Sequence, residues 1–271
     1  KMPAGKFFLE IFAGVGHLRV AAAAAGLRVA VPIDARNGDH LDVTCKAVAD
    51  VIIGWILAGR IWMVWLGTPC TSWTAALRRH RGSDGAGGQA RDAAGLACAR
   101  FTCRVLRACR SAGVQFVVEN PRNSALWQWP PLVRFTRRAV SVSLEMCSYG
   151  AAWRKPTRLV GTLEGLERMG QLCPGHGRHV VLQGSVHLPG TGWRWRTSFA
   201  SVYPLRFCRR LAGLCWDAAP SPAWRSCADA RLDEQRGSQL AAARSSVVDE
   251  PFHLGALPRA ATLGWESADG R

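Results

Sequence analysis

The chain has 271 residues, of which 48% are apolar, so it can form a full hydrophobic core and is not a wholly disordered protein. Its 35 Lys and Arg residues against 19 Asp and Glu residues give a formal net charge of +16. This excess either reflects a composition biased toward arginine or attracts a polyanionic partner. We favour the second interpretation, with nucleic acid as the partner. Ten cysteines without a dense framework are typical of reduced thiols. We therefore expect an intracellular protein, nuclear if its source is a eukaryote.

The first predicted strand covers residues 7–12 and runs into the glycine turn Ala13-Gly14-Val15-Gly16. An alanine-rich helix over 18–25 follows it. A second strand is predicted over 27–33 and ends at Asp34. Open α/β folds place an acidic residue at this position on the ribose of a nucleotide, although such a residue can also be a simple cap.

The stretch from 48 to 66 is apolar enough to resemble a membrane span. Arg60 and two glycines interrupt it, and a charged residue is costly inside a bilayer. We therefore predict a helix over 45–58, a turn and a central strand over 61–66, with no membrane segment.

A Pro-Cys pair follows this central strand, in the sequence Gly67-Thr68-Pro69-Cys70. Proline fixes φ and removes a backbone donor, so the cysteine leaves the strand in a defined direction. A later strand over 114–118 runs into Glu119-Asn120-Pro121. Because open α/β sheets carry their chemistry at the carboxyl ends of the strands, these groups predict an enzyme with a cysteine nucleophile. The alternative for Cys70 is an inert buried thiol.

A basic segment, Arg78-Arg79-His80-Arg81, precedes glycines at 82, 85, 87 and 88, and a helix is predicted over 96–112. The glycines predict a flexible loop. We expect this loop to close on nucleic acid, with Arg78, Arg79 and Arg81 on phosphates. An ordinary solvated basic loop is the alternative.

Later strands are predicted over 140–144 and 157–160. Strands that alternate with helices indicate an α/β fold with a largely parallel, doubly wound sheet. From about Asp217 the pattern decays into Ala, Pro, Ser and Arg without periodicity. We therefore assign 1–215 to one catalytic domain and 216–271 to a largely irregular tail or linker.

Five segments, in order, resemble the motifs of the DNA cytosine-C5 methyltransferases, and their variants look most like compact phage- and retroelement-associated members. The segments are Phe12-Ala13-Gly14-Val15-Gly16, Thr68-Pro69-Cys70-Thr71-Ser72-Trp73, Glu119-Asn120-Pro121-Arg122-Asn123-Ser124, Tyr149-Gly150 with Arg154-Lys155-Pro156-Thr157, and Ser198 to Pro204. The resemblance spans most of the chain and implies a Rossmann-like, S-adenosyl-L-methionine-dependent methyltransferase that acts on cytosine in DNA.

The resemblance also implies residue roles. Cys70 would add to cytosine C6, Glu119 would hold the pyrimidine, and Pro69, Asn120 and Lys155 would complete the catalytic set. The cofactor would contact Phe12, Ala13, Gly14, Val15, Gly16, Asp34, Asp42, Thr68, Ser201 and Val202. For Asp42, N-capping is the competing interpretation.

Double-stranded DNA, with the target cytosine flipped out, would be the partner of a monomeric catalytic domain. Arg122 and Arg154 would contact nucleic acid beside the basic loop, although a solvated charge run is the alternative. An RNA cytosine methyltransferase is a rival interpretation. A catalytically decayed, nucleic-acid-binding domain of a mobile-element polyprotein is another.

Two departures from the family pattern stand out. Only the short region 161–196 is available for target recognition, and Ala200-Ser201 replaces a common Gly-Asn pair. Within that region Cys173, His176 and His179 have metal-like spacing, with Cys147 as a fourth candidate. They are either zinc ligands or ordinary loop residues, and we assign no metal from the sequence.

Overall fold

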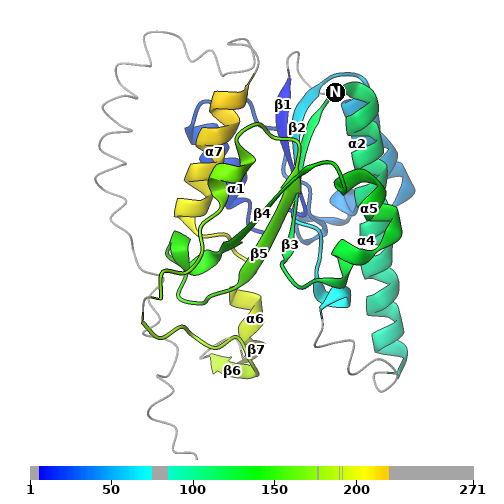
Figure 1. Cartoon of the computed structure of the whole chain (residues 1–271). Helices are drawn as coiled ribbons and strands as arrows, with labels where there is room; N and C mark the ends of the chain where they lie inside the picture. Colours follow the sequence, from blue (N-terminus) through cyan, green and yellow to red (C-terminus); the bar gives the residue numbers. More distant parts are fainter. Residues whose placement is uncertain (1–5, 75–84, 176, 189, 191, 220–271) are drawn as a thin grey trace, which may run out of the picture. The chain divides into compact units, whose positions relative to one another are not determined.

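The computed structural model describes residues 6–74, 85–175, 177–188, 190 and 192–219 of the chain (Figure 1). The described residues up to Val180, together with those from Ala200 onward, form one compact unit. The residues from Val181 to Phe199 belong to a second, smaller unit.

The first unit is built on a five-stranded sheet with the strand order β1-β2-β3-β5-β4. The strands are β1 (Phe7–Ile11), β2 (Ile61–Leu66), β3 (Gln115–Pro121), β4 (Val140–Glu145) and β5 (Pro156–Gly161). The first three pair in parallel, whereas β5 runs antiparallel to both β3 and β4. Four strands of this sheet therefore share one direction, which confirms the predicted mixed α/β fold with a mostly parallel sheet.

Helices cover both faces of this sheet (Figure 1). On one face α1 (His17–Ala24) packs against α7 (Leu205–Ala218). On the other, α4 (Gly85–Ala112) packs against α2 (Lys46–Leu57) and α5 (Pro130–Thr136). A sheet covered on both faces must bury both sides of its strands, which explains their unbroken apolar sequences.

Successive side chains of β2 point to opposite faces of the sheet and pack into two different hydrophobic cores. Val64 and Leu66 are fully buried in the core that includes α2 and α4. Met63 and Trp65 are fully buried in the core that includes α1 and α7. The apolar stretch from 48 to 66 is thus divided between α2 and β2, as predicted. Within the described ranges, no helix has the length and apolarity needed to cross a bilayer.

The prediction of a regular strand over residues 27–33 is wrong. This segment joins β1 only through two isolated parallel bridges, Phe8 with Val29 and Ile11 with Ile33. Pro32 lies between these bridges and lacks the N–H that a continuous ladder requires. The segment still runs beside β1, so Asp34 lies near the sheet edge where β1 ends.

The predicted loop around Gly85, Gly87 and Gly88 is also wrong, because α4 begins at Gly85. Glycine lowers helix stability by about 1 kcal/mol per residue relative to alanine, which a long packed helix can offset. Further along α4, a Cβ at Gly95 would overlap the Ser72 side chain, so this glycine permits a close approach. Residues 78–82, which carry the predicted arginine contacts, lie outside the described residues.

The region from 161 to 196, predicted as an insertion, is divided between the two units. Leu163, Leu166 and Met169 are fully buried in the core with α7. The second unit contains an antiparallel hairpin of β6 (Ser185–Leu188) and β7 (Gly192–Trp195), followed by α6 (Arg196–Phe199). Of the predicted tail, α7 covers the first residues, and those from 220 onward are outside the described part of the chain.

Candidate active site

The ends of β1, β2 and β3 meet at one edge of the sheet. Leu66, the last residue of β2, pairs with Ile11 on one side and Val118 on the other. The segments that continue from these residues carry the glycine turn, Cys70 and Glu119. As predicted, the three strands therefore bring these residues to the same edge of the sheet.

A cavity of about 400 Å³ opens at this edge. Eleven of the predicted site residues line it, and they come from all five motif segments and from the region between α1 and α2. These are Phe12, Ala13, Gly14, Asp34, Asp42, Thr68, Pro69, Cys70, Glu119, Lys155 and Ser201. Arg36, Cys98 and Tyr203 also line the cavity and were not predicted.

Cys70 follows β2 and lies directly before the short 3-10 helix η3 (Thr71–Trp73). Its side chain is half-buried and lines the cavity. Burial raises the pKa of the Cys70 thiol, while the Lys155 ammonium lowers it and the Glu119 carboxylate adds to the rise. A positive local field favours the thiolate, which is the nucleophilic form of cysteine. Lys155 supplies that field, but burial outweighs it.

Glu119 lies in β3 and is buried. Its Oε2 accepts a hydrogen bond of 2.9 Å from the Tyr203 hydroxyl, and its Oε1 lies 3.7 Å from Lys155 Nζ. Among the described residues, Glu119 Oε1 has no hydrogen-bond partner. A buried polar atom left in this state is costly, so this oxygen is available to a ligand in the cavity.

Lys155 reaches the site from an unusual backbone conformation. Its φ of 24° lies in the left-handed region, which is strained for a residue with a side chain. The ammonium donates to the Ala200 carbonyl at 3.0 Å and lies 5.9 Å from the centroid of the Tyr203 ring. Strain of this kind persists only when surrounding contacts hold it, and it is common at functional sites.

Tyr203 links these groups and was missed, although the sequence analysis assigned its neighbours Ser201 and Val202 to the cofactor. Its hydroxyl accepts a hydrogen bond of 3.3 Å from Trp65 Nε1. Burial and the nearby Glu119 raise the pKa of Tyr203 well above its usual value, so the phenol stays neutral. A Cβ on Gly67 would lie 2.8 Å from this hydroxyl, and glycine at that position therefore lets Tyr203 approach.

Asn120 does not line the cavity but supports the turn that carries the cysteine. Its Nδ2 donates to the Thr68 carbonyl at 2.6 Å, and the Thr68 and Thr102 hydroxyls lie 2.9 Å apart. All three residues are buried. These contacts fix the Thr68-Pro69 backbone between β3 and α4.

Asp34 organises the other end of the cavity. Its carboxylate accepts hydrogen bonds from the backbone N–H of Gly14 at 2.7 Å and of Arg36 at 2.9 Å. The Arg36 guanidinium also pairs with it, at 3.1 Å. Burial favours a higher pKa for Asp34, but the hydrogen bonds from Arg36 and Gly14 lower it below its usual value. Asp34 therefore stays ionised, and it also caps η1 (Ala35–Asn37).

Several other predicted residues have mainly local roles. Asp42 lines the cavity, but its carboxylate also accepts hydrogen bonds from Thr44 N and Oγ1. Gly16, with φ 73°, is the N-cap of α1. Val15 is exposed, and neither it nor Gly16 or Val202 lines the cavity.

Arg122 and Arg154 flank the buried carboxylate of Glu145. Arg154 Nε donates to Glu145 Oε2 at 2.9 Å, and Arg122 Nη1 lies 4.0 Å from Oε1. Both arginine side chains remain about half exposed, so each keeps donors facing solvent. Neither lines the cavity.

No protein-family model and no curated protein matches the chain. Among solved structures, it aligns with the methyltransferase EhMeth of Entamoeba histolytica at 12% identity, covering 59% of this chain and 53% of that one, with a TM-score of 0.38. A proposed DNA modification methyltransferase encoded within an E. coli prophage aligns at 15% identity, covering 58% and 46%, with a TM-score of 0.36. The chain thus matches about half the length of each. At these TM-scores neither alignment supports a conclusion about this chain.

Proposed function

We propose that this chain transfers a methyl group from S-adenosyl-L-methionine to C5 of cytosine in DNA, through a covalent bond between Cys70 and cytosine C6. The observation that supports this most is that Cys70, Glu119 and Lys155 line one cavity. Their order along the chain also matches the cytosine-C5 methyltransferase motifs that the sequence resembles.

The chemistry accounts for these residue types. Cytosine C5 is a poor nucleophile until a group adds at C6, and a thiolate can both add there and leave again. As the Cys70 sulfur bonds to C6, the electrons of the C5–C6 double bond shift to C5 and toward N3. A proton held between Glu119 Oε1 and N3, and passed to N3 as the sulfur adds, would neutralise that charge. C5 then attacks the methyl group, and the carbon–sulfonium bond breaks so that the cofactor leaves as a neutral thioether. The C5 proton passes to water acting as a base, and the sulfur–C6 bond breaks as the double bond re-forms and the Cys70 thiolate leaves.

The cavity has features that fit the cofactor. Asp34 is an ionised acceptor, suited to the hydroxyls of a ribose. The exposed Arg36 side chain, which pairs with it now, can move aside. Gly14 lacks a Cβ and has φ 59°, so its backbone is open to close approach. The cofactor would supply an electrophilic methyl group on a sulfonium.

Tyr203 and Lys155 have supporting roles in this proposal. The Tyr203 hydroxyl holds Glu119 Oε2, which leaves Oε1 directed to the pyrimidine. Lys155 carries a positive charge beside both Cys70 and Glu119. It therefore favours the thiolate before attack and the negative charge that develops on the ring afterwards.

DNA is the substrate we propose because the net charge of +16 attracts phosphates, and because a base must leave the stack before its C6 can reach Cys70. Arg122 and Arg154, which keep exposed donors, are the described candidates for phosphate contacts. The arginines at 78, 79 and 81 remain part of this proposal.

The test is methyl transfer from labelled cofactor to DNA and, separately, to RNA. We expect transfer to DNA, loss of it in Cys70→Ser, and retention in the matched variant Cys98→Ser, since Cys98 also lines the cavity. Glu119→Gln should be slower by roughly a hundredfold. Transfer to RNA alone would favour the RNA enzyme. Binding without transfer to either would favour a decayed domain.

A further inference from the structure

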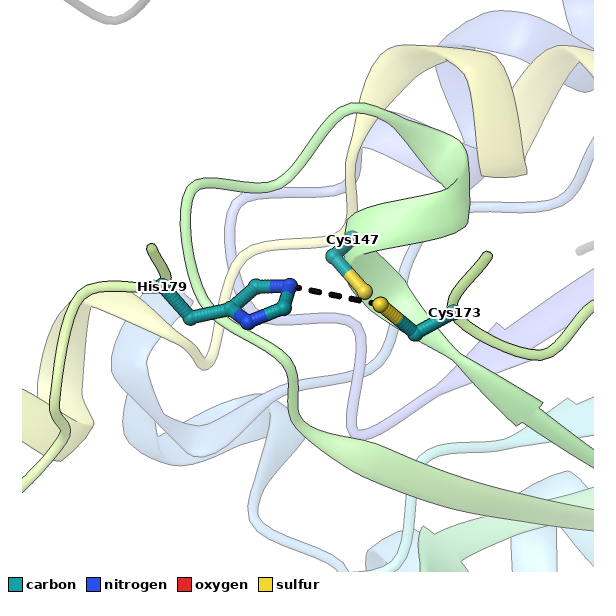
Figure 2. A group of neighbouring side chains, drawn as sticks. All are labelled: Cys147, Cys173 and His179. Atoms are coloured by element: carbon teal, nitrogen blue, oxygen red, sulfur yellow. Dashed lines mark hydrogen bonds between the residues drawn. The ribbon is translucent and has the colours of Figure 1, made fainter. Parts of the chain in front are cut away.

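Three side chains that are common metal ligands meet outside the cavity. They are Cys147, Cys173 and His179, and their candidate ligand atoms all lie within 4.8 Å of one another. Figure 2 shows the two sulfurs close together, with the imidazole ring directed toward them. Cys173 Sγ and His179 Nε2 are 3.6 Å apart.

The sulfur–nitrogen separation of 3.6 Å matches a tetrahedral zinc site. With zinc–sulfur bonds of about 2.3 Å and zinc–nitrogen bonds of about 2.05 Å, tetrahedral angles place the sulfur and the nitrogen about 3.6 Å apart. Two such sulfurs would lie about 3.8 Å apart. Thiolate and imidazole ligands favour zinc, whereas magnesium and calcium prefer oxygen ligands.

We propose that Cys147, Cys173 and His179 bind one zinc ion, with water in the fourth position. Cys147 lies in the short 3-10 helix η5 (Met146–Tyr149), which follows β4. Cys173 and His179 lie more than twenty residues further along the chain, after η6 (Leu166–Met169). The ion therefore cross-links two segments that the sequence keeps apart.

The segment that carries Cys173 and His179 is one that a bound zinc ion would stabilise. In its described residues, the stretch from 171 to 180 has no helix or strand. It is attached by scattered bonds, such as Cys173 N to Glu145 Oε2 at 3.0 Å and Val180 N to the Ala152 carbonyl at 2.8 Å. A zinc ion bonded to both sides would add a far stronger link than these hydrogen bonds.

This link lies next to the segment that delivers Lys155 to the cavity. The Met146 N–H donates to the Arg154 carbonyl at 3.1 Å, which closes the turn between η5 and β5. The zinc ion would hold the start of that turn through Cys147. It would hold the other side through His179, because the adjacent Val180 bonds to the Ala152 carbonyl within the turn. We therefore assign zinc a positioning role for Lys155, and no part in the bond-making steps.

The direct test is the zinc content of the full chain. The protein is purified under reducing conditions without a metal-affinity step and analysed by elemental mass spectrometry. We expect about one zinc per chain. Cys147→Ser, Cys173→Ser and His179→Ala should each lower the zinc affinity tenfold or more. Cys45→Ser, at an exposed cysteine outside the cluster, should leave it unchanged.

Two further measurements guard against variants that only misfold. His179→Cys keeps three ligands and should retain zinc, unlike His179→Ala. Cobalt(II) added to the zinc-free wild-type chain should give thiolate-to-cobalt charge-transfer absorption and the strong visible bands of a tetrahedral ion. Zinc should then displace that spectrum.

Two results would overturn the proposal. One is a wild-type chain that holds no more zinc than a chain carrying Cys147→Ser, Cys173→Ser and His179→Ala together, and that gives no thiolate–cobalt absorption. Only a thiol–imidazole hydrogen bond would then remain. The other is a Cys147–Cys173 disulfide in place of two metal-binding thiols, detected by the mass of the non-reduced protein even when zinc is present throughout purification. Neither readout depends on methyl transfer, so the zinc site and the proposed function can fail separately.

Discussion

The Tyr203 hydroxyl donates a hydrogen bond of 2.9 Å to Glu119 Oε2, joining two residues that are 84 positions apart in the sequence. The bond is buried and also involves Trp65, whose Nε1 donates to the same hydroxyl. Tyr203 therefore fixes which carboxylate oxygen of Glu119 is satisfied within the protein and which is open to the cavity.

Tyr203→Phe should lower the turnover number for DNA methylation about tenfold, because Glu119 loses the group that orients it. It should also destabilise the fold by about 1–3 kcal/mol, since Glu119 Oε2 is left unsatisfied. Steady-state kinetics and denaturant unfolding measure the two effects. Tyr149→Phe is the matched control, because it removes another buried hydroxyl, bonded to the Met169 carbonyl. Equal losses of turnover in both variants would show that Tyr203 has no special role.

Lys155→Met should raise the pKa of Cys70 further, because the ammonium is the charge that opposes burial. The rate of Cys70 alkylation follows the thiolate fraction, so its rise with pH should move to higher pH. Alkylation read by peptide mass spectrometry measures this directly. Lys46→Met, at an exposed lysine paired with Asp50, should leave the profile in place. An unchanged profile in Lys155→Met would contradict the electrostatic role.

Glu10 makes stability depend on pH. Burial raises its pKa from 4.5 to about 7, although the Arg19 N–H and charge oppose the rise. The folded state therefore keeps a proton that the unfolded chain releases, and stability falls as the pH rises from about 4.5 to about 7. The loss from this group is about 3 kcal/mol and is complete above that range.

Glu10→Gln should remove this dependence. The variant should therefore be more stable than the wild type at pH 8 and about equally stable at pH 4.5. Urea unfolding across the range measures the gain. Glu164→Gln, at an exposed glutamate, is the control. Parallel stability curves for wild type and Glu10→Gln would show that Glu10 is ionised in the folded state throughout.

The hairpin of β6 and β7 presents exposed aromatic rings. Trp193 is 73% exposed and Trp195 69% exposed, and Arg194 lies between them in the sequence. Base stacking on an aromatic ring contributes about 1–3 kcal/mol per base. The double substitution Trp193→Ala with Trp195→Ala should therefore weaken binding to single-stranded DNA tenfold or more, as measured by anisotropy. Leu57→Ala, at another exposed apolar residue, should not, and equal affinities for all three proteins would exclude a stacking role.

The sequence predicted the centre of the sheet well, because β2 and β3 are buried on both faces and their apolar runs end at clear turn residues. It also predicted that Cys70 and Glu119 would lie at one sheet edge, where both line the cavity. The prediction of a strand over residues 27–33 failed because a sequence pattern does not reveal whether a neighbouring strand forms a continuous hydrogen-bond ladder. Pro32 interrupts the ladder with β1.

The contacts that tune the site could not be read from local patterns. Tyr203 meets Glu119 only once α7 has packed against the sheet, and Gly67 is needed because the tyrosine approaches there. The effect of burial on the Cys70 thiol likewise depends on the folded surroundings. The ligand spacing at Cys173 and His179 was visible in the sequence, whereas the proximity of Cys147 required the fold.

The most direct test of the proposed function is covalent capture on DNA that contains 5-fluorocytosine. Fluorine at C5 cannot leave as the proton does, so the enzyme should remain bonded to C6 after methyl transfer. We predict a cofactor-dependent adduct, mapped by peptide mass spectrometry to Cys70, present in Cys98→Ser and absent in Cys70→Ala. An adduct that persists in Cys70→Ala, or that maps to another residue, would contradict the assignment of Cys70 as the nucleophile.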